Sequence, residues 1–415
     1  MAVTINQVPA NYTPAFNPQI FEATSTAIGN SDFYYKVVCT DQITGATQTY
    51  QVKQRPTTGE LVFDASVFSK NYIDHYVPNN VYGWQKCTNA VRRIIVNIGE
   101  YYGGTYYPGA NRQYIIWNSA QRGIDWPSYS YTNYVFNGAG SNVKFLSSLP
   151  PESASYKVGE SYTYTDASLF HYALSYGNGD VGLVKIITYT KYDTVIGTSY
   201  IANPYSSGYT YTDKYVCIDI GSKGLTNIGS LSVTGTYPIL SANTAYYEVY
   251  DNSNLGSPSA STDTLVRRVY LNCEGKYTVY TLHYLARNGN FETINFSKRS
   301  DHLESAQKNS YRPNPNVLAS NNYSYSASAK FERVLSSTGT ETYKLNSDWI
   351  SENQMNAHRE IVTSPLVYMD LGSTTGLVQV KVNNADILIN KSFNNKLFAL
   401  QIDVEQTAKN NYQFG

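Results

Sequence analysis

Three short apolar runs follow one another between residues 265 and 300, and they constrain the fold more than any other stretch. A polar segment that contains Gly275 separates the first two runs. The sequence Asn-Gly-Asn at 288–290 then favours a tight hairpin turn, because Asn and Gly accept the positive φ that such turns need. The third run spans 291–296. We therefore expect three adjacent strands, whose inward faces form the centre of one domain.

The composition favours strands and turns over helices. Tyrosine is the outlier, with 41 residues against 14 Phe and 4 Trp. A large apolar ring with a polar tip suits half-buried strands and hydrated interfaces. With 415 residues the chain is too long for one small core, so we expect about two to four domains. The predicted fold class is mainly β, with tandem β-sandwich domains of immunoglobulin or fibronectin type and a small C-terminal α/β unit.

Residues 1–150 predict a first β-sandwich domain. Apolar and polar side chains alternate from Phe33 to Thr40, which is typical of a half-buried strand. A turn at Gly45 leads to its expected partner strand at 47–53. Ser66 is then expected to cap a short helix. Further strands are expected at 61–63 and 94–98.

Residues 101–145 predict long loops that carry aromatic side chains, because Pro108-Gly109 and Trp126-Pro127 are typical turn sequences. Packing of these aromatic residues against one another is the simpler interpretation. Alternatively, these aromatic residues form a surface that binds a polymer or a partner protein.

The sequence Leu149-Pro150-Pro151 predicts a boundary, and 151–300 predicts a second β-sandwich domain. A weak internal repeat relates the two domains, since VRRIIVN at 91–97 matches VRRVYLN at 266–272. The repeat would place Arg92-Arg93 and Arg267-Arg268 on equivalent strands. Adjacent strand residues face opposite ways, so one arginine of each pair should point outward. Nearby carboxylates are their expected partners. Strands of the second domain are expected at 169–176, 183–189, 214–220, 245–250 and 265–296.

Residues 301–340 are rich in Ser, Asn and Pro, which predicts an extended arm or linker. Residues 341–415 predict a helix with strands that pack on the second domain. Ser351 and Gln354 have the spacing of a capping box, so a helix should begin at 352 and end near Pro365. Strands are expected at 366–371, 377–382, 387–389 and 397–405, with a hairpin turn at Asn383-Asn384.

Lysine plus arginine and aspartate plus glutamate both number 31, so the net charge is zero. A neutral chain is a poor match for nucleic acid, whose phosphates need a basic excess. We see neither a signal peptide nor an apolar run of membrane-spanning length, which predicts folding in a cytoplasm. We expect the cysteines to be reduced and mostly buried, because they are widely spaced along the chain. They are Cys39, Cys87, Cys217 and Cys273.

Catalytic and metal-binding patterns are absent from the sequence. The five histidines share no ligand spacing, and no hydrolase or nucleotide-binding motif occurs. Asp301, His302 and Glu304 could form a metal or acid–base group, although a polar loop is the simpler interpretation. Glu100 and Glu160 could serve as a carboxylate pair for glycoside hydrolysis only at a defined separation in space. We therefore expect no catalytic residues, no metal site, no cofactor and no enzymatic activity. The histidines are His75, His171, His283, His302 and His358.

Several stretches together carry a resemblance to a known family. In chain order they are NYTPAFNPQIFEATST, GELVFDASVFSKNYI, VNIGEYYGGTYY with IIWNSA, LHYLARNGNFETINFSKRS, and SDWISENQMNAHREIVTSPLVYMD. The chain resembles the tail or baseplate-type structural proteins of tailed phages that infect Bacteroidetes, including the tail hub proteins of crAss-like phages. The resemblance implies a virion component that forms a ring. The number of copies in the ring would be a multiple of six, such as twelve. It also implies contacts with other tail, portal-ring or fibre proteins, and no enzyme.

Three functions therefore compete. The first is a structural tail hub or adaptor, which assembles from identical subunits through the arm at 300–340 and the region 101–145. The second is a receptor- or glycan-binding tail protein, in which Trp84, Trp126 and Tyr106-Tyr107 would stack on sugars. The third is an enzyme such as a glycan hydrolase.

Overall fold

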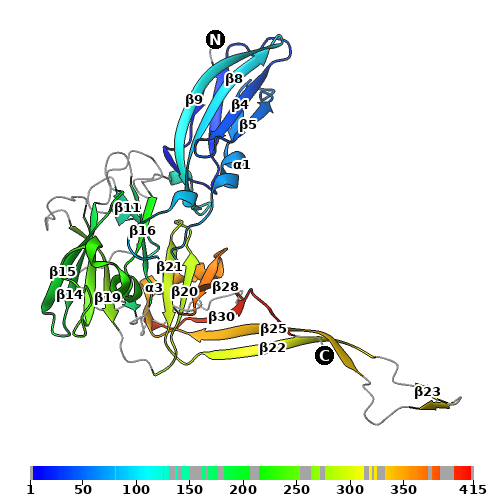
Figure 1. Ribbon diagram of the computed structural model, residues 1–415. Coiled ribbons are helices and arrows are strands. Elements are labelled where there is room, and N and C mark those ends of the chain that lie inside the picture. The colour runs from blue at the N-terminus through cyan, green and yellow to red at the C-terminus, as the bar shows by residue number, and fades with distance from the viewer. Residues whose placement is uncertain are drawn as a thin grey trace.

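The fold is mainly β in the computed structural model of the chain (Figure 1). The sheets group into three modules and a projecting arm. The structure describes residues 3–79, 81–124, 126–129, 136–137, 143–149, 161–163, 167–175, 182–205, 215–252, 263–271, 276–312, 317–319, 322–324, 332–372, 376–383 and 397–412.

The first module contains two sheets that share one core. Tyr35, Val37 and Cys39 point inward from alternate positions of β4 (Tyr34–Asp41), which confirms the predicted half-buried strand. The turn at Gly45 is also confirmed, with φ at 69°. One sheet has the order β1 (Val3–Gln7), β3 (Ile20–Ser25), β6 (Leu61–Asp64), and the other has the order β2 (Tyr12–Pro14), β9 (Thr105–Trp117), β8 (Val91–Tyr102), β4 (Tyr34–Asp41), β5 (Thr47–Val52).

Two local predictions in this module are wrong. Residues 105–117 form strand β9, not a loop, and Pro108 with Gly109 lie where the register with β8 shifts. A bulge tolerates Pro and Gly inside a strand, which explains why turn-like residues occur there. Ser66 is not the N-cap of α1 (Ser66–Ser69), because Ala65 occupies that position. Asp64 accepts a hydrogen bond from the backbone N–H of Ser66 instead (2.9 Å). A 3-10 helix, η1 (Lys70–Tyr72), follows.

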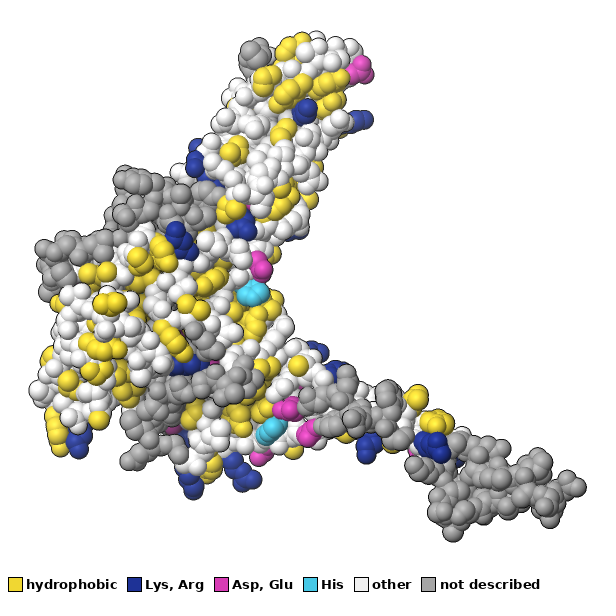
Figure 2. Space-filling model, in the orientation of Figure 1, with side chains coloured by type: hydrophobic (Ala, Val, Ile, Leu, Met, Phe, Trp, Pro, Cys, Tyr) yellow, Lys and Arg dark blue, Asp and Glu magenta, His cyan; other side chains and the backbone are white. Residues whose placement is uncertain are grey.

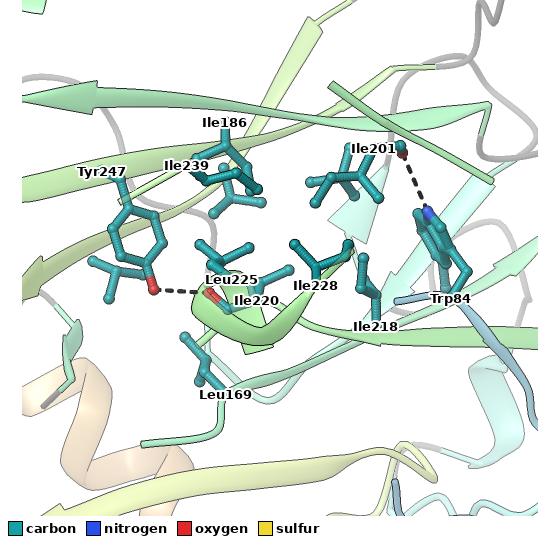
Figure 3. Close-up of a cluster of buried hydrophobic side chains, with 14 of the residues drawn as sticks. Trp84, Leu169, Ile186, Ile201, Ile218, Ile220, Leu225, Ile228, Ile239 and Tyr247 are labelled. Carbon is teal, nitrogen blue, oxygen red and sulfur yellow. Dashed lines mark hydrogen bonds between the residues drawn. The ribbon is translucent and has the colours of Figure 1, made fainter. Parts of the chain in front are cut away.

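The second module also contains two sheets around one core, which Figure 3 shows. Its first sheet draws strands from before residue 150, because β7, β10 and β11 pair there with β13 and β16. That sheet has the order β10 (Phe136–Asn137), β11 (Val143–Leu146), β13 (Phe170–Ser175), β16 (Tyr215–Asp219), β7 (Gln85–Lys86). The other has the order β12 (Ser161–Thr163), β19 (Asp263–Leu271), β18 (Tyr246–Asn252), β14 (Leu183–Tyr189), β15 (Val195–Ala202), β17 (Val233–Gly235), and α2 spans Ser222–Asn227.

The third module is a larger antiparallel sheet with a helix packed on one face. Helix α3 (Glu352–His358) begins at the predicted residue, and 3-10 helix η8 (Arg359–Val362) continues it to the turn before Pro365. The sheet has the order β21 (Phe291–Phe296), β20 (Tyr280–Leu285), β27 (Val367–Asp370), β28 (Leu377–Val382), β30 (Gln401–Gln406), β25 (Arg333–Asn346), β22 (Asp301–Tyr311), while β31 (Asn410–Tyr412) pairs with β25, and β26 (Ile350–Ser351) pairs with β29 (Leu397–Phe398).

The expectation of three adjacent strands at 265–300 is wrong in one respect. β20 and β21 form the predicted hairpin, and Ala286 donates to the carbonyl of Asn290 across its turn (2.9 Å). β19, however, belongs to the second module, whereas β20 pairs on its other side with β27. The pairing partner of a strand can lie far along the chain, so an unbroken run of strands in sequence need not form one sheet. The domain boundaries expected after residues 150, 300 and 340 remain predictions.

The arm is a two-stranded ribbon that leaves the third module (Figure 1). β22 and β25 pair in antiparallel register from Asp301 opposite Lys344 to Tyr311 opposite Arg333. All described side chains of β22 are exposed. The segment 301–340, expected to be an extended arm or linker, thus contains a regular β-ribbon, with a short pair of strands, β23 (Val317–Ala319) and β24 (Asn322–Ser324), farther out. The strand expected at 387–389 lies outside the described residues.

Candidate functional site

The group Asp301, His302 and Glu304 lies on the exposed base of the arm. His302 Nε2 lies 3.1 Å from a carboxylate oxygen of Glu341, and its ring stacks on Tyr343 with centroids 4.2 Å apart. Among the described residues, His, Cys, Asp and Glu side chains form no cluster of three that could hold a metal ion. The arrangement is that of a polar ribbon surface, where side chains interact with their cross-strand neighbours.

Glu100 is buried on β8 and accepts a hydrogen bond from Ser25 Oγ (2.7 Å). Its predicted companion, Glu160, lies outside the described residues. Glu100 therefore links two strands of the first module, as a buried polar group with a hydrogen-bond partner commonly does.

The histidines are dispersed. His171 Nε2 lies 3.0 Å from Asp251 in the second module, and His75 Nε2 lies 3.1 Å from Tyr368 Oη. Burial lowers the pKa of His283 to about 4 and the pKa of His358 to about 3. Both rings are neutral near pH 7, because burial in low dielectric disfavours the charged form.

The cysteines behave as predicted where the structure describes them. Cys39, Cys87 and Cys217 are buried and free. Burial raises the pKa of Cys39 to about 12 and raises the pKa of Cys87 well above its ordinary value. The raised pKa values keep the thiols of Cys39 and Cys87 protonated at neutral pH, which makes these two cysteines poor nucleophiles. Cys273 lies outside the described residues.

The expectation that one arginine of each pair points outward is confirmed only in part. In the first pair, Arg92 is 9% exposed, and Arg93 lies in an exposed pairing with Gln113. Both Arg267 and Arg268 are buried instead. Their strand β19 is covered on two faces, because Arg268 pairs with Glu248 of the neighbouring strand and Arg267 approaches Glu292 of the third module (3.8 Å).

The aromatic side chains expected to stack on sugars differ in how far they are buried. Trp84 is buried in the second-module core and donates through Nε1 to the carbonyl of Ile201 (3.2 Å), as Figure 3 shows. Trp126 is half-buried and stacks on Tyr129. Packing of aromatics on one another is thus confirmed at Trp126.

A tyrosine cluster lies where β8 turns into β9. Two stacked pairs form it, with ring centroids 4.7 Å and 4.5 Å apart. A lysine, Lys36, lies over a further ring, 4.4 Å from its centroid. These rings are half-buried, so each presents part of its surface to solvent. The tyrosine cluster comprises Tyr34, Tyr101 and Tyr106 on one face of the sheet and Tyr102 and Tyr107 on the other.

The three modules meet at the hairpin turn 288–290. Tyr215 Oη of the second module donates to the carbonyl of Gly289 (2.8 Å), and Asn288 Nδ2 donates to the carbonyl of Ser147 (3.0 Å). Trp117 Nε1 of the first module donates to the carbonyl of Asn288 (3.1 Å). The turn itself was evident in the sequence, whereas its role in joining modules left no local signal. A shared apolar cluster surrounds it, including Tyr12, Val91, Trp117, Tyr172, Leu174, Leu285 and Phe291.

Charged groups reinforce this junction. Glu292 is buried and accepts hydrogen bonds from Ser147 Oγ (2.7 Å) and the backbone N–H of Ser148 (2.6 Å). Lys223 of the second module pairs with Asp370 of the third at 3.2 Å, and both side chains are buried. Satisfied buried polar contacts of this kind fix one geometry, since a displaced partner would be left unpaired.

A cavity of about 470 Å³ opens beside the junction, between the first and third modules. Its lining is mostly apolar and includes Phe16, Ile73, Leu285 and Pro365. Arg287 at its wall is paired with Glu360 and donates to it through Nε (2.9 Å). Asp74 and His75 also line the cavity, and His75 Nδ1 lies 2.8 Å from Asp74 Oδ1.

No protein-family model matches this chain, and no curated protein is significantly similar to it. Among the described residues, no helix is both long enough and apolar enough to span a membrane.

Proposed function

We propose that this chain is a structural protein of the virion of a tailed phage. The observation that carries the proposal is the arm, a ribbon that leaves the body and whose β22 side chains are all exposed (Figure 2). A projecting ribbon of this kind gains apolar and hydrogen-bonding partners only from another molecule. Such a feature suits a subunit that assembles.

Within this class we propose a tail hub or adaptor. Identical subunits would form a ring whose copy number is a multiple of six, such as twelve. The ring would bind other tail, portal-ring or fibre proteins. A ring requires head-to-tail contacts between two different surfaces of each subunit. The arm and the region 101–145, which carries part of the tyrosine cluster, are the two surfaces we propose. The role involves no catalysis, cofactor, metal or specific nucleic-acid contact.

The surface chemistry of the arm and its surroundings supports the proposal. Leu303 on β22 and Leu335 on β25 are 48% and 56% exposed, and Trp349 beside the arm's base is 63% exposed. Large apolar side chains that stay exposed on and beside a projecting feature favour burial against a partner. We also propose that the first two modules are sandwiches of the immunoglobulin or fibronectin type. The protein would fold in the host cytoplasm and act in the virion tail.

Deletion of residues 305–325 tests the proposal. The deletion removes the outer part of β22, so ring formation should be lost while the three modules stay folded. Light scattering would measure the assembly state and electron microscopy would show rings. The replacement Leu231→Ser is a matched control, because Leu231 is fully exposed away from the arm. Rings formed by the deleted protein would refute the arm's role, and purified virions without this chain would refute the virion role.

The tyrosine cluster favours a second function, a receptor- or glycan-binding tail protein. Half-exposed stacked rings can bind the apolar faces of sugars. Combined replacement of Tyr102 and Tyr107 by serine should then abolish binding to host cells or surface glycans without changing the assembly state. If the unmodified protein binds neither cells nor glycans, this second function is refuted.

A further inference from the structure

The arm offers one edge for strand pairing along its base. Among the strands that the structure describes, β22 is the terminal strand of its sheet, so one side of its backbone faces away from β25. The far side of β25 is already paired, with β31 over 337–339 and with β30 over 342–346. A head-to-tail series of ribbons would need both edges. The strand arrangement therefore favours a contact in which β22 of one copy meets β22 of another.

Charge is separated along β22. Asp301 and Glu304 lie toward the body, whereas Lys308, and Arg312 just beyond the end of the strand, lie toward the tip. Figure 2 shows acidic side chains where the arm leaves the body and basic side chains farther out. Edge strands are usually protected from pairing by charges that repel a second copy. The separation seen here would oppose a parallel, in-register pairing but not an antiparallel one.

The sequence of β22 is self-complementary about Ala306. If two β22 strands run antiparallel with Ala306 opposite itself, Glu304 of each copy lies opposite Lys308 of the other. Ser305 then lies opposite Gln307, and Leu303 lies opposite Asn309. Opposite charges that face each other across strands stabilise a sheet, and like charges in that position destabilise it. This register therefore creates two favourable charge pairs and no repulsive one among these positions.

We propose that two copies of this chain associate through their β22 strands, antiparallel and two-fold symmetric about Ala306. The two ribbons then form one continuous sheet that spans both copies. A two-fold contact joins copies in pairs and cannot by itself close a ring. The two-fold contact uses β22 alone and does not depend on the proposed virion role. It leaves the outer strands of the arm, β23 and β24, for the head-to-tail contact that would close a ring.

A charge-reversal series on the full-length chain tests the pairing. Glu304→Lys should weaken dimerisation, because lysine would then face Lys308 twice per dimer, and Lys308→Glu should do the same. We expect each dissociation constant to rise about tenfold. The double variant Glu304→Lys with Lys308→Glu should restore the original value. Analytical ultracentrifugation measures the dissociation constants, and circular dichroism checks that each variant is folded.

Disulfide trapping tests the register independently. In a Cys273→Ser background, Ala306→Cys should cross-link readily on mild oxidation, since the two-fold axis places the residue opposite itself. Leu303→Cys is the matched control, because its two copies would be about 20 Å apart along the strands. An equimolar mixture of Leu303→Cys and Asn309→Cys should give the mixed dimer.

Three results would overturn the inference. The full-length chain could remain monomeric at every concentration tested. Leu303→Cys could cross-link as readily as Ala306→Cys. The double charge swap could also fail to restore the dissociation constant while both single variants remain folded.

Discussion

Trp117 donates a hydrogen bond through Nε1 to the backbone carbonyl of Asn288, 3.1 Å away, across a sequence separation of 171 residues. The tryptophan ends strand β9 of the first module and is fully buried, and Asn288 begins the turn between β20 and β21 of the third. Because Tyr215 of the second module bonds to the next residue, Gly289, the same turn holds all three modules. Together with the contacts between His75 and Tyr368 and between Lys223 and Asp370, this turn therefore holds the third module, from which the arm projects, against the other two.

Gly289→Ala should destabilise this junction strongly. Gly289 has φ of 90°, and a Cβ there would lie 2.0 Å from the carbonyl oxygen of Asn118. Because backbone atoms must move to relieve that contact, we expect a loss of about 3 kcal/mol in the free energy of unfolding. Urea unfolding measures the loss, and small-angle X-ray scattering should report a change in the angle between modules.

The matched control for this prediction is Gly45→Ala. Gly45 also has positive φ, at 69°, but a Cβ there would meet nothing within 4 Å. The substitution should therefore cost only the conformational term, about 1 kcal/mol. Equal losses for the two variants would contradict the close approach at Gly289.

Replacing one partner of the Lys223–Asp370 pair should lower the free energy of unfolding more than replacing both partners. Both side chains are buried where the second and third modules meet, with Nζ and Oδ2 at 3.2 Å. Lys223→Met leaves an uncompensated buried carboxylate, which should cost about 3–5 kcal/mol. The double variant Lys223→Met with Asp370→Leu should lose much less. Chemical unfolding of the two single variants and the double variant measures the coupling, and additive losses would contradict it.

Local features were predictable from the sequence. The alternation along β4 predicted Tyr35, Val37 and Cys39 as core residues, because one face of that strand packs on the module's own second sheet. The capping box at Ser351 and the hairpin turn at 288–290 were also predictable, since each depends on residues within a few positions of one another.

The grouping of strands into modules was not predictable. β20 is buried on both faces, with Leu282 in the third-module core and Leu285 in the junction, so its pattern has no period of two. Its neighbour β27 comes from far along the chain, with Leu282 opposite Met369. The regular strand pairing of the arm was not predictable either. Every side chain of β22 is exposed, so the sequence shows no apolar face that would indicate a strand. Its β-ribbon form depends on β25 as a partner.

Stability should fall between about pH 7 and pH 5.5. Burial lowers the pKa of His283 to about 4 and of His358 to about 3. The unfolded chain therefore binds protons there that the folded chain does not, and stability is lost as pH falls below the ordinary histidine pKa. Asp219 opposes this, because burial raises its pKa to about 6 and its contribution is lost as pH rises through that value.

The two histidines destabilise the fold as the pH falls, and Asp219 offsets part of that effect. The free energy of unfolding should therefore fall by roughly 2 kcal/mol between pH 7 and pH 5.5. Urea unfolding at several pH values measures it. His358→Gln should flatten the pH dependence, because it removes one of the two groups that gain protons on unfolding. A pH dependence unchanged in this variant, or stability that rises toward pH 5.5, would contradict the assignment.

Ser351→Ala should destabilise the third module by about 1 kcal/mol. Ser351 Oγ accepts from the backbone N–H of Gln354 (3.3 Å), and the Gln354 side chain accepts from the backbone N–H of Ser351 (3.0 Å). Because α3 packs on the core through Met355, loss of the cap should be measurable in urea unfolding. Ser66→Ala is the matched control, since Ser66 begins α1 without any capping role, and its replacement should change stability by less than about 0.5 kcal/mol. A loss at Ser66 equal to that at Ser351 would contradict the capping assignment.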